Sequence, residues 1–261
     1  MKINPSVRKQ ILELLLTTVL KKIDTYQPET VHAPFHHRLL GKDRYALFSF
    51  IHSMSTTFGT SVFEQVAEAL ARGVGYRAER QFKLLGQIDE KTAKLIDKIN
   101  LSLRSGKMSA DKSTLIEQIR KSIVPGNKNR DPDSTVDLYV EVDGCENYID
   151  ITSAKPNMKE FATLQRKLMR WIALRLSINK SQNVMTKLAI PYNPYHPKPY
   201  ERWTLQGLFD LKRGEVLVGE EFWNFVGGGD IYQDLLDIFE EAGKQLRPEL
   251  DKKFAQYKNS S

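Results

Sequence analysis

Cysteine is almost absent from this chain of 261 residues, and Cys145 is its single representative. A lone cysteine cannot close a disulfide within the chain, and we interpret Cys145 as a turn residue rather than a nucleophile. The sequence also has no apolar run long enough to span a bilayer, and we expect no N-terminal signal peptide. These absences exclude a disulfide-stapled scaffold and a membrane-spanning protein, and we expect a cytoplasmic protein without membrane contact.

Acidic residues are scarce in the middle of the chain. The whole sequence has 39 Lys and Arg against 32 Asp and Glu, which gives a net charge of +7. Residues 152–187 contain eight basic residues and one acid, Glu160, whereas residues 215–241 contain eight acids and no Lys or Arg. Concentrated positive charge favours a polyanionic partner, although many basic proteins bind none.

Hydrophobic periodicity divides the chain into helical and extended parts. Helical spacing of apolar residues predicts helices within residues 6–24, 45–54, 62–71 and 86–123. The period then changes to two over residues 136–142, where apolar and polar residues alternate, and this pattern predicts a half-buried strand. Asp143-Gly144 is a strong turn signal, so residues 148–152 are expected to form the returning strand of a hairpin.

A helix is predicted to begin just after this hairpin. Pro156 precedes Asn157, a good N-cap, and Glu160 follows three residues later, as in a capping box. Residues 184–191 then indicate a buried strand. This order predicts an α/β fold with a mixed β-sheet flanked by helices. We expect a single domain with helical additions at the N-terminus (about 1–123) and the C-terminus (about 205–261).

Two acidic residues stand at similar distances on either side of the hairpin turn, Asp137 and Asp150. Facing carboxylates on neighbouring strands repel each other unless a cation lies between them. Hard divalent cations such as Mg²⁺ select carboxylates, carbonyls and water, and they support phosphodiester hydrolysis. A lysine, Lys155, follows where the second strand ends. The alternative is that both acids are simply the outward-facing side chains of an amphipathic hairpin.

Several segments resemble a known nuclease family. Residues 136–140 (VDLYV) and 148–157 (YIDITSAKPN) resemble the PD-(D/E)xK nuclease signature. Residues 191–204 (PYNPYHPKPYERWT) and 221–228 (EFWNFVGG) are similar to the TdeIII-type family of type II restriction endonucleases, and the resemblance extends over about residues 34–243. It implies a restriction-endonuclease-like fold and Mg²⁺-dependent cleavage of double-stranded DNA at a short GGNCC-like site, leaving 5′-phosphates. It further implies a homodimer and a companion DNA methyltransferase.

The resemblance also assigns roles to individual residues. Asp137 and Asp150 would bind the metal, together with the backbone carbonyl of Ile151. The signature expects a lysine two residues after the second acid, but this chain has Thr152 there. Either Lys155 reaches in from the strand end, or the Thr152 hydroxyl orients water, or the protein binds DNA without cleaving it. We favour Lys155, although its opposite strand parity requires a bend or bulge.

Glu64 is a further catalytic candidate. Residues 59–67 (GTSVFEQVA) resemble the helix that brings a glutamate to the metal in many restriction enzymes. The alternative is an ordinary exposed glutamate on a helix.

Residues 192–204 form a candidate DNA-recognition segment, because proline-rich backbone can present side chains rigidly to a duplex. The residues predicted to face DNA here are Asn193, Lys198 and Arg202, and the alternative is a loop packed on the core through its aromatic rings. Further phosphate contacts are predicted for Arg166, Lys167 and Arg170, which would otherwise be a solvated helix face. Two other readings stay open: an RNA-processing or repair nuclease, and a protein-interaction scaffold.

Overall fold

A mixed β-sheet forms the centre of the computed structural model, which describes residues 2–28, 32–124, 128–129, 133–152, 154–200, 205 and 207–258. Within these ranges the sheet has five strands in the order β1-β4-β5-β6-β7. The strands are β1 (Arg77–Lys83), β4 (Thr135–Val142), β5 (Cys145–Ile151), β6 (Val184–Ile190) and β7 (Val216–Val218). Pairing is antiparallel from β1 to β5 and parallel from β5 to β7. The predicted α/β fold with a mixed sheet is therefore confirmed.

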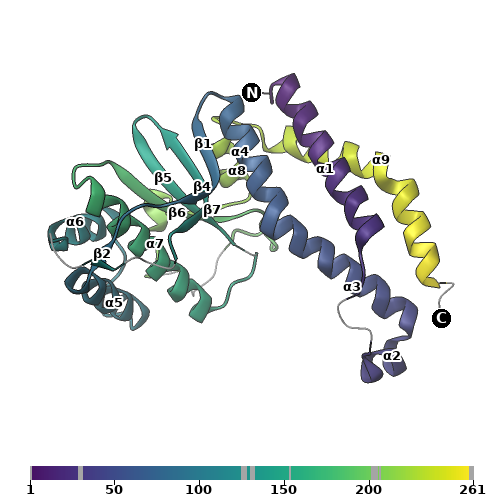
Figure 1. Cartoon of the computed structure of the whole chain (residues 1–261), viewed down its shortest axis with the longest axis horizontal. Coiled ribbons are helices and arrows are strands. Elements are labelled where there is room, and N and C mark those ends of the chain that lie inside the picture. The colour runs from purple at the N-terminus through teal and green to yellow at the C-terminus, as the bar shows by residue number, and fades with distance from the viewer. Residues whose placement is uncertain are drawn as a thin grey trace.

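Helices cover both faces of this sheet (Figure 1). One layer contains α1 (Pro5–Thr25), α4 (Phe63–Gly73), α8 (Glu220–Val226) and α9 (Tyr232–Lys258). The other layer contains α5 (Glu90–Arg104), α6 (Lys112–Ser122) and α7 (Met158–Ile178). Two short strands, β2 (Ile88–Asp89) and β3 (Lys128–Asn129), pair beside α5. Among the described helices, none has the length and apolar character needed to cross a membrane.

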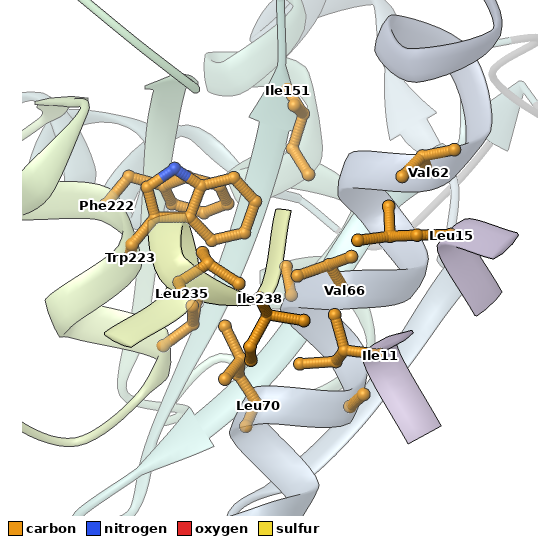
Figure 2. Packing of buried hydrophobic residues seen from close by; sticks show 14 of the residues in the cluster. Ile11, Leu15, Val62, Val66, Leu70, Ile151, Phe222, Trp223, Leu235 and Ile238 are labelled. Atoms are coloured by element: carbon orange, nitrogen blue, oxygen red, sulfur yellow. The ribbon is translucent and has the colours of Figure 1, made fainter. Parts of the chain in front are cut away.

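The first layer is held to the sheet by a continuous apolar core. Figure 2 shows Ile11 of α1, Val66 and Leu70 of α4, and Ile238 of α9 meeting beside Trp223 of α8. In Figure 1 the N-terminal α1 (purple) lies alongside the C-terminal α9 (yellow). The two ends of the chain are thus packed together, because each helix turns an apolar stripe toward the same core.

The β4–β5 hairpin has the turn that the sequence predicts. Asp143 and Gly144 have φ angles of 49° and 73°, and Val142 pairs with Cys145. Two central residues with positive φ are the mark of a type I′ turn, which the Asp-Gly pair favours. The prediction of a half-buried strand is wrong in one respect. Tyr139, expected on a polar face, is only 3% exposed, because α-helices cover both faces of the sheet.

The helical region before the hairpin departs from the prediction at strands β1 and β2, and the helix expected over residues 86–123 is two separate helices, α5 and α6. The apolar runs at 45–54 and 62–71 belong to α3 (Lys42–Thr57) and α4, which a π-helical turn (Phe58–Val62) joins into one long rod (Figure 1). A short helix, α2 (Pro34–Leu40), precedes α3, and a 3₁₀ turn (Leu211–Arg213) precedes β7. Strand β1 was not predicted, because its sequence RAERQFK lacks the alternation of apolar residues that marks a strand.

Gln81 in β1 has an unusual backbone conformation, with φ of 52°. Its neighbours Arg80 and Phe82 pair with Leu138 and Val136, so Gln81 lies across from Asp137. Phe82 packs in the core under α7, whereas Ala78 of the same strand packs in the core under α4. The strand therefore changes the face to which its side chains point at Gln81, beside the first of the two predicted metal-binding acids.

We predict that replacing Gln81 will reverse the usual preference for alanine over glycine in a strand. Positive φ costs an L-residue about 1–2 kcal/mol, and glycine is free of this cost. Both Gln81→Gly and Gln81→Ala remove the side-chain amide, so their difference isolates the backbone. Urea unfolding should find the glycine variant more stable by about 1 kcal/mol. A more stable alanine variant would show that the backbone at this position is unstrained.

Candidate active site

Strands β4 and β5 separate at the acid pair. Their last register pair is Leu138 with Ile149, although β5 continues to pair with β6 as far as Ile151 and Ala189. Beyond that point the N–H of Ile151 donates to Oδ2 of Asp137 at 2.8 Å. A carboxylate thus takes the place of a strand carbonyl as the acceptor. The sheet opens where the two predicted metal-binding acids lie.

Asp137 and Asp150 interact unfavourably when both are ionised. Burial raises the pKa of Asp137 to about 7, and the negative charge of Asp150 adds to this rise. The hydrogen bond from Ile151 and the charge of Lys167 act in the opposite direction. Asp150 itself is only 4% exposed. The ionised form of Asp137 is therefore disfavoured first by burial and then by its acidic neighbours, and perturbed carboxyl pKa values of this kind cluster at functional sites.

Lys167 of α7 contacts the acid pair directly. Its Nζ donates to Oδ2 of Asp150 at 2.5 Å and lies 4.8 Å from the centre of the Trp171 ring. Burial opposes the charge of Lys167, but the carboxylates of Asp150 and Asp137 outweigh it and raise the pKa of this lysine. Lys167 is thus a cation held against the second acid, a different setting from the solvated helix face that was its alternative.

Glu64 of α4 approaches the same acids from the opposite layer. It is only 5% exposed, and its Oε2 accepts a hydrogen bond of 2.7 Å from Nε2 of Gln81. Burial raises the pKa of Glu64, Gln81 and Arg80 lower it, and the charge of Asp150 raises it further. The exposed-glutamate alternative is therefore wrong, since Glu64 is buried and interacts electrostatically with the acid pair.

A groove of about 890 Å³ leads to the open end of the sheet. Ile151 and Thr152 lie at its base, beside Pro191 at the end of β6. Its walls come from α3 and the π-helical turn on one side and from the start of α7 on the other. Helix α7 begins there with the predicted capping box, in which Asn157 and Glu160 bond reciprocally. The groove is open to solvent and reaches the end of β5 at Ile151, the residue that follows Asp150.

The lysine that the sequence favours contacts a different group. Nζ of Lys155 lies 5.4 Å from the centre of the Tyr195 ring, in the proline-rich segment. Thr152 follows directly after β5 and donates its N–H to the carbonyl of Ala189 at 2.9 Å. Of the two lysines, Lys167 is the one with a hydrogen bond to the acid pair, and the role predicted for Lys155 has no contact that supports it.

The predicted DNA-binding residues are dispersed. Both ends of the Asn193 amide bond within its own loop, to the Lys198 carbonyl at 2.7 Å and to the Tyr195 N–H at 2.9 Å. Lys198 is exposed, and Arg202 lies outside the described residues. On α7, Arg166 bonds to Asp97 of α5 at 2.6 Å, and Arg170 is half-buried.

Sequence reasoning missed two contributors to this site. Gln81 lies in a strand that was not predicted, and no motif marks it. Lys167 was assigned to phosphate binding, but strand parity held a signal. Asp150 alternates with Ile149 and Ile151, which pack under α4, so its side chain points toward the layer of α7. A basic residue on that helix was therefore well placed to reach Asp150.

The donor groups at the opening of the sheet fit a hard divalent cation. They include the carboxylate oxygens of Asp137 and Asp150, a ligand type that Mg²⁺ prefers, and burial together with the neighbouring acids raises the pKa of Asp137. Within the described ranges, no three His, Cys, Asp or Glu side chains form a ready-made metal site. Mg²⁺ usually keeps several waters and is bound by one or two protein carboxylates, and the acid pair is compatible with such a site.

The sequence of this chain is similar to those of known proteins over most of its length. The sequence model of a family described as "Type II restriction endonuclease, HinfI" matches residues 2–243. The type II restriction enzyme HgiCII of Herpetosiphon aurantiacus is 24% identical, covering 97% of this chain and 99% of the relative. The type II restriction enzyme MjaII of Methanocaldococcus jannaschii is 25% identical, covering 80% of this chain and 57% of the relative. The predicted resemblance to type II restriction endonucleases is confirmed.

We predict that Asp137→Asn will stabilise the metal-free protein at pH 8. The folded state raises the pKa of this carboxyl above its unfolded value, so ionisation of Asp137 destabilises the fold as pH rises from about 4 through 7. The amide removes that charge, and we expect a gain of roughly 1–3 kcal/mol. Thermal unfolding in EDTA measures it.

The control for this prediction is Asp251→Asn, which removes one exposed acid from α9. It should leave the unfolding temperature unchanged both at pH 8 and at pH 4. The gain with Asp137→Asn should shrink at pH 4, where the native carboxyl is already protonated. A lower unfolding temperature for Asp137→Asn at pH 8 would contradict the charge argument.

Proposed function

This chain belongs to the HinfI family of type II restriction endonucleases, and we propose that it cleaves double-stranded DNA at a short specific sequence. One observation carries the proposal within the structure: Asp137 and Asp150 lie where β4 and β5 separate, and the residue after Asp150, Ile151, lines an open groove. An acid pair at the opened end of a sheet offers oxygen ligands to a metal beside a surface that a duplex can approach.

The proposed cofactor is Mg²⁺, held by Asp137, Asp150 and the carbonyl of Ile151. When bound, Mg²⁺ lowers the pKa of a coordinated water and offsets the charge of the scissile phosphate. The protein's part is to orient the ligands. The N–H of Ile151 fixes Asp137, Lys167 fixes Asp150, and Gln81 fixes Glu64 at the edge of the cluster. Cleavage of the P–O3′ bond with transfer of the water oxygen to phosphorus leaves a 5′-phosphate.

The groove and its basic border support DNA as the ligand. Eight Lys and Arg lie in residues 152–187 with one acid, and this segment includes α7 beside the groove. We propose that the cations of this segment hold the phosphate backbone and that the proline-rich segment after β6 reads a GGNCC-like site. The residues proposed to contact DNA are Asn193, Lys198, Arg202, Arg166 and Arg170.

The proposed enzyme acts as a homodimer in the cytoplasm, within one endonuclease domain per chain. A pair of active sites is the direct way to cut both strands of a duplex. Exposed apolar side chains of α2 and α3, among them Phe35, Leu39 and Phe48, are of the kind that a dimer contact buries. A companion DNA methyltransferase would protect the host's own sites, without any need for physical association.

Incubation with plasmid DNA and Mg²⁺ tests this function. Discrete fragments that map to GGNCC-like sequences are expected, and the ends should be joined by a ligase without prior phosphorylation. EDTA should abolish cleavage. Asp150→Asn should slow cleavage by more than roughly 100-fold, since loss of a metal ligand costs several kcal/mol of transition-state stabilisation. The exposed-acid variant Asp251→Asn is the matched control and should cut at the native rate.

Other outcomes identify other functions. Retarded but intact DNA under every metal condition would indicate a non-cleaving DNA-binding protein, the alternative that Thr152 raises. Degradation without fixed fragments would indicate an RNA-processing or repair nuclease. The absence of DNA binding even at low salt would overturn the proposal entirely.

A further inference from the structure

The proposed active site has an amine, but it does not come from the strand position where the nuclease signature has one. At that position Thr152 supplies a hydroxyl, and its N–H is engaged with Ala189 at the end of the sheet. A lysine in such a site supplies positive charge next to the scissile phosphate and the attacking water. The charge must therefore come from another element.

Lys167 has the contacts that such a role requires. Its Nζ lies 2.5 Å from Oδ2 of Asp150, and its side chain is 26% exposed while that of Asp150 is 5% exposed. The ammonium is thus bonded to an acid of the pair and still reaches solvent. The Trp171 ring lies below it at 4.8 Å and limits the positions that the amine can take.

Helix α7 places this lysine one turn beyond the wall of the groove. Thr163 lines the groove, and Lys167 follows four residues later on the same face of the helix. Leu168 and Ile172 are fully buried under the sheet, so the helix cannot turn about its axis without losing its core contacts. The position of the Lys167 backbone is consequently fixed by packing, as a preorganised charge requires.

We propose that Lys167 is the active-site lysine of this enzyme and that its ammonium contacts the scissile phosphate from α7, in place of a lysine at position 152. The inference rests on the proposed nuclease function. Lys167 remains protonated and forms no covalent bond with DNA. Its charge stabilises the negative charge that builds up on the phosphate oxygens as water attacks. Lys155, which stacks on Tyr195, instead braces the proline-rich segment.

The test compares single-turnover cleavage by Lys167→Met, Lys155→Met and the double variant Thr152→Lys/Lys167→Met. Lys167→Met should slow cleavage on the order of 100-fold or more. The loss of cleavage rate caused by Lys155→Met should be at least about tenfold smaller than the loss caused by Lys167→Met. The double variant returns an amine to the strand position, from which strand parity directs it toward Asp150, and it should recover at least about tenfold over Lys167→Met.

Two further measurements separate catalysis from folding and binding. Affinity for a specific duplex in Ca²⁺, measured by fluorescence anisotropy, should change less than about fivefold in Lys167→Met, because most phosphate contacts remain. Circular dichroism checks the fold of each variant. The matched control is Lys98→Met, which removes one exposed cation from α5 and should match the native enzyme in every measurement.

The results that overturn the inference are distinct from those that overturn the nuclease function. Native-rate cleavage by folded Lys167→Met would overturn it, as would a larger loss with Lys155→Met. If Lys167→Met does not fold, the double variant decides. A double variant that folds and cleaves DNA supports the inference. A double variant that folds without cleaving DNA, or that does not fold, overturns it. A native enzyme that cuts no DNA would refute the nuclease function itself.

Discussion

Repulsion between two buried carboxylates is the constraint around which this end of the sheet is built. Asp137 and Asp150 come from neighbouring strands, and the pKa of Asp137 is raised first by burial and then by the charge of Asp150. If β4 and β5 stayed hydrogen-bonded beyond Leu138 and Ile149, the N–H of Ile151 would bond to a backbone carbonyl and not to the carboxylate of Asp137. Instead β5 stays paired with β6 while β4 separates, and the Ile151 N–H turns to the Asp137 carboxylate. Fold stability is given up locally at this end of the sheet, where the acid pair lies.

Both helical layers place a charged side chain beside this pair, and the two charges act on Asp137 in opposite directions. From the layer of α4, Glu64 reaches the cluster with Gln81, whose positive φ turns its amide toward that glutamate. From the layer of α7, Lys167 supplies the opposite charge. Side chains of a strand point alternately to the two faces of the sheet, so an acid on either face contacts the helical layer that covers that face. A site at the end of the sheet is reached by both, which explains why residues distant in sequence meet there.

The local parts of this arrangement follow from sequence, and the tertiary parts do not. The Asp-Gly turn, the acid pair around it and the capping box of α7 each depend on residues a few positions apart, and the structure has all three. Strand β1 is held by its pairing with β4, because its own residues lack a strand pattern. Gln81 depends on that pairing. Lys167 meets Asp150 only because α7 packs on one face of the sheet. Hydrophobic periodicity predicts that α7 is buried, but it does not predict which residues of α7 lie beside which residues of the sheet.

Thr152 illustrates the difference between a motif and the chemistry it stands for. A signature with lysine two residues after an acid works because strand alternation directs both side chains to one place. The chemical requirement is a positive charge at that place, and the chain position is one means of satisfying it. The face of the sheet that bears Asp150 is covered by α7, so a helix residue can satisfy the same requirement. The absence of lysine at position 152 therefore does not leave Asp150 without a neighbouring positive charge, because Lys167 forms an ion pair with it.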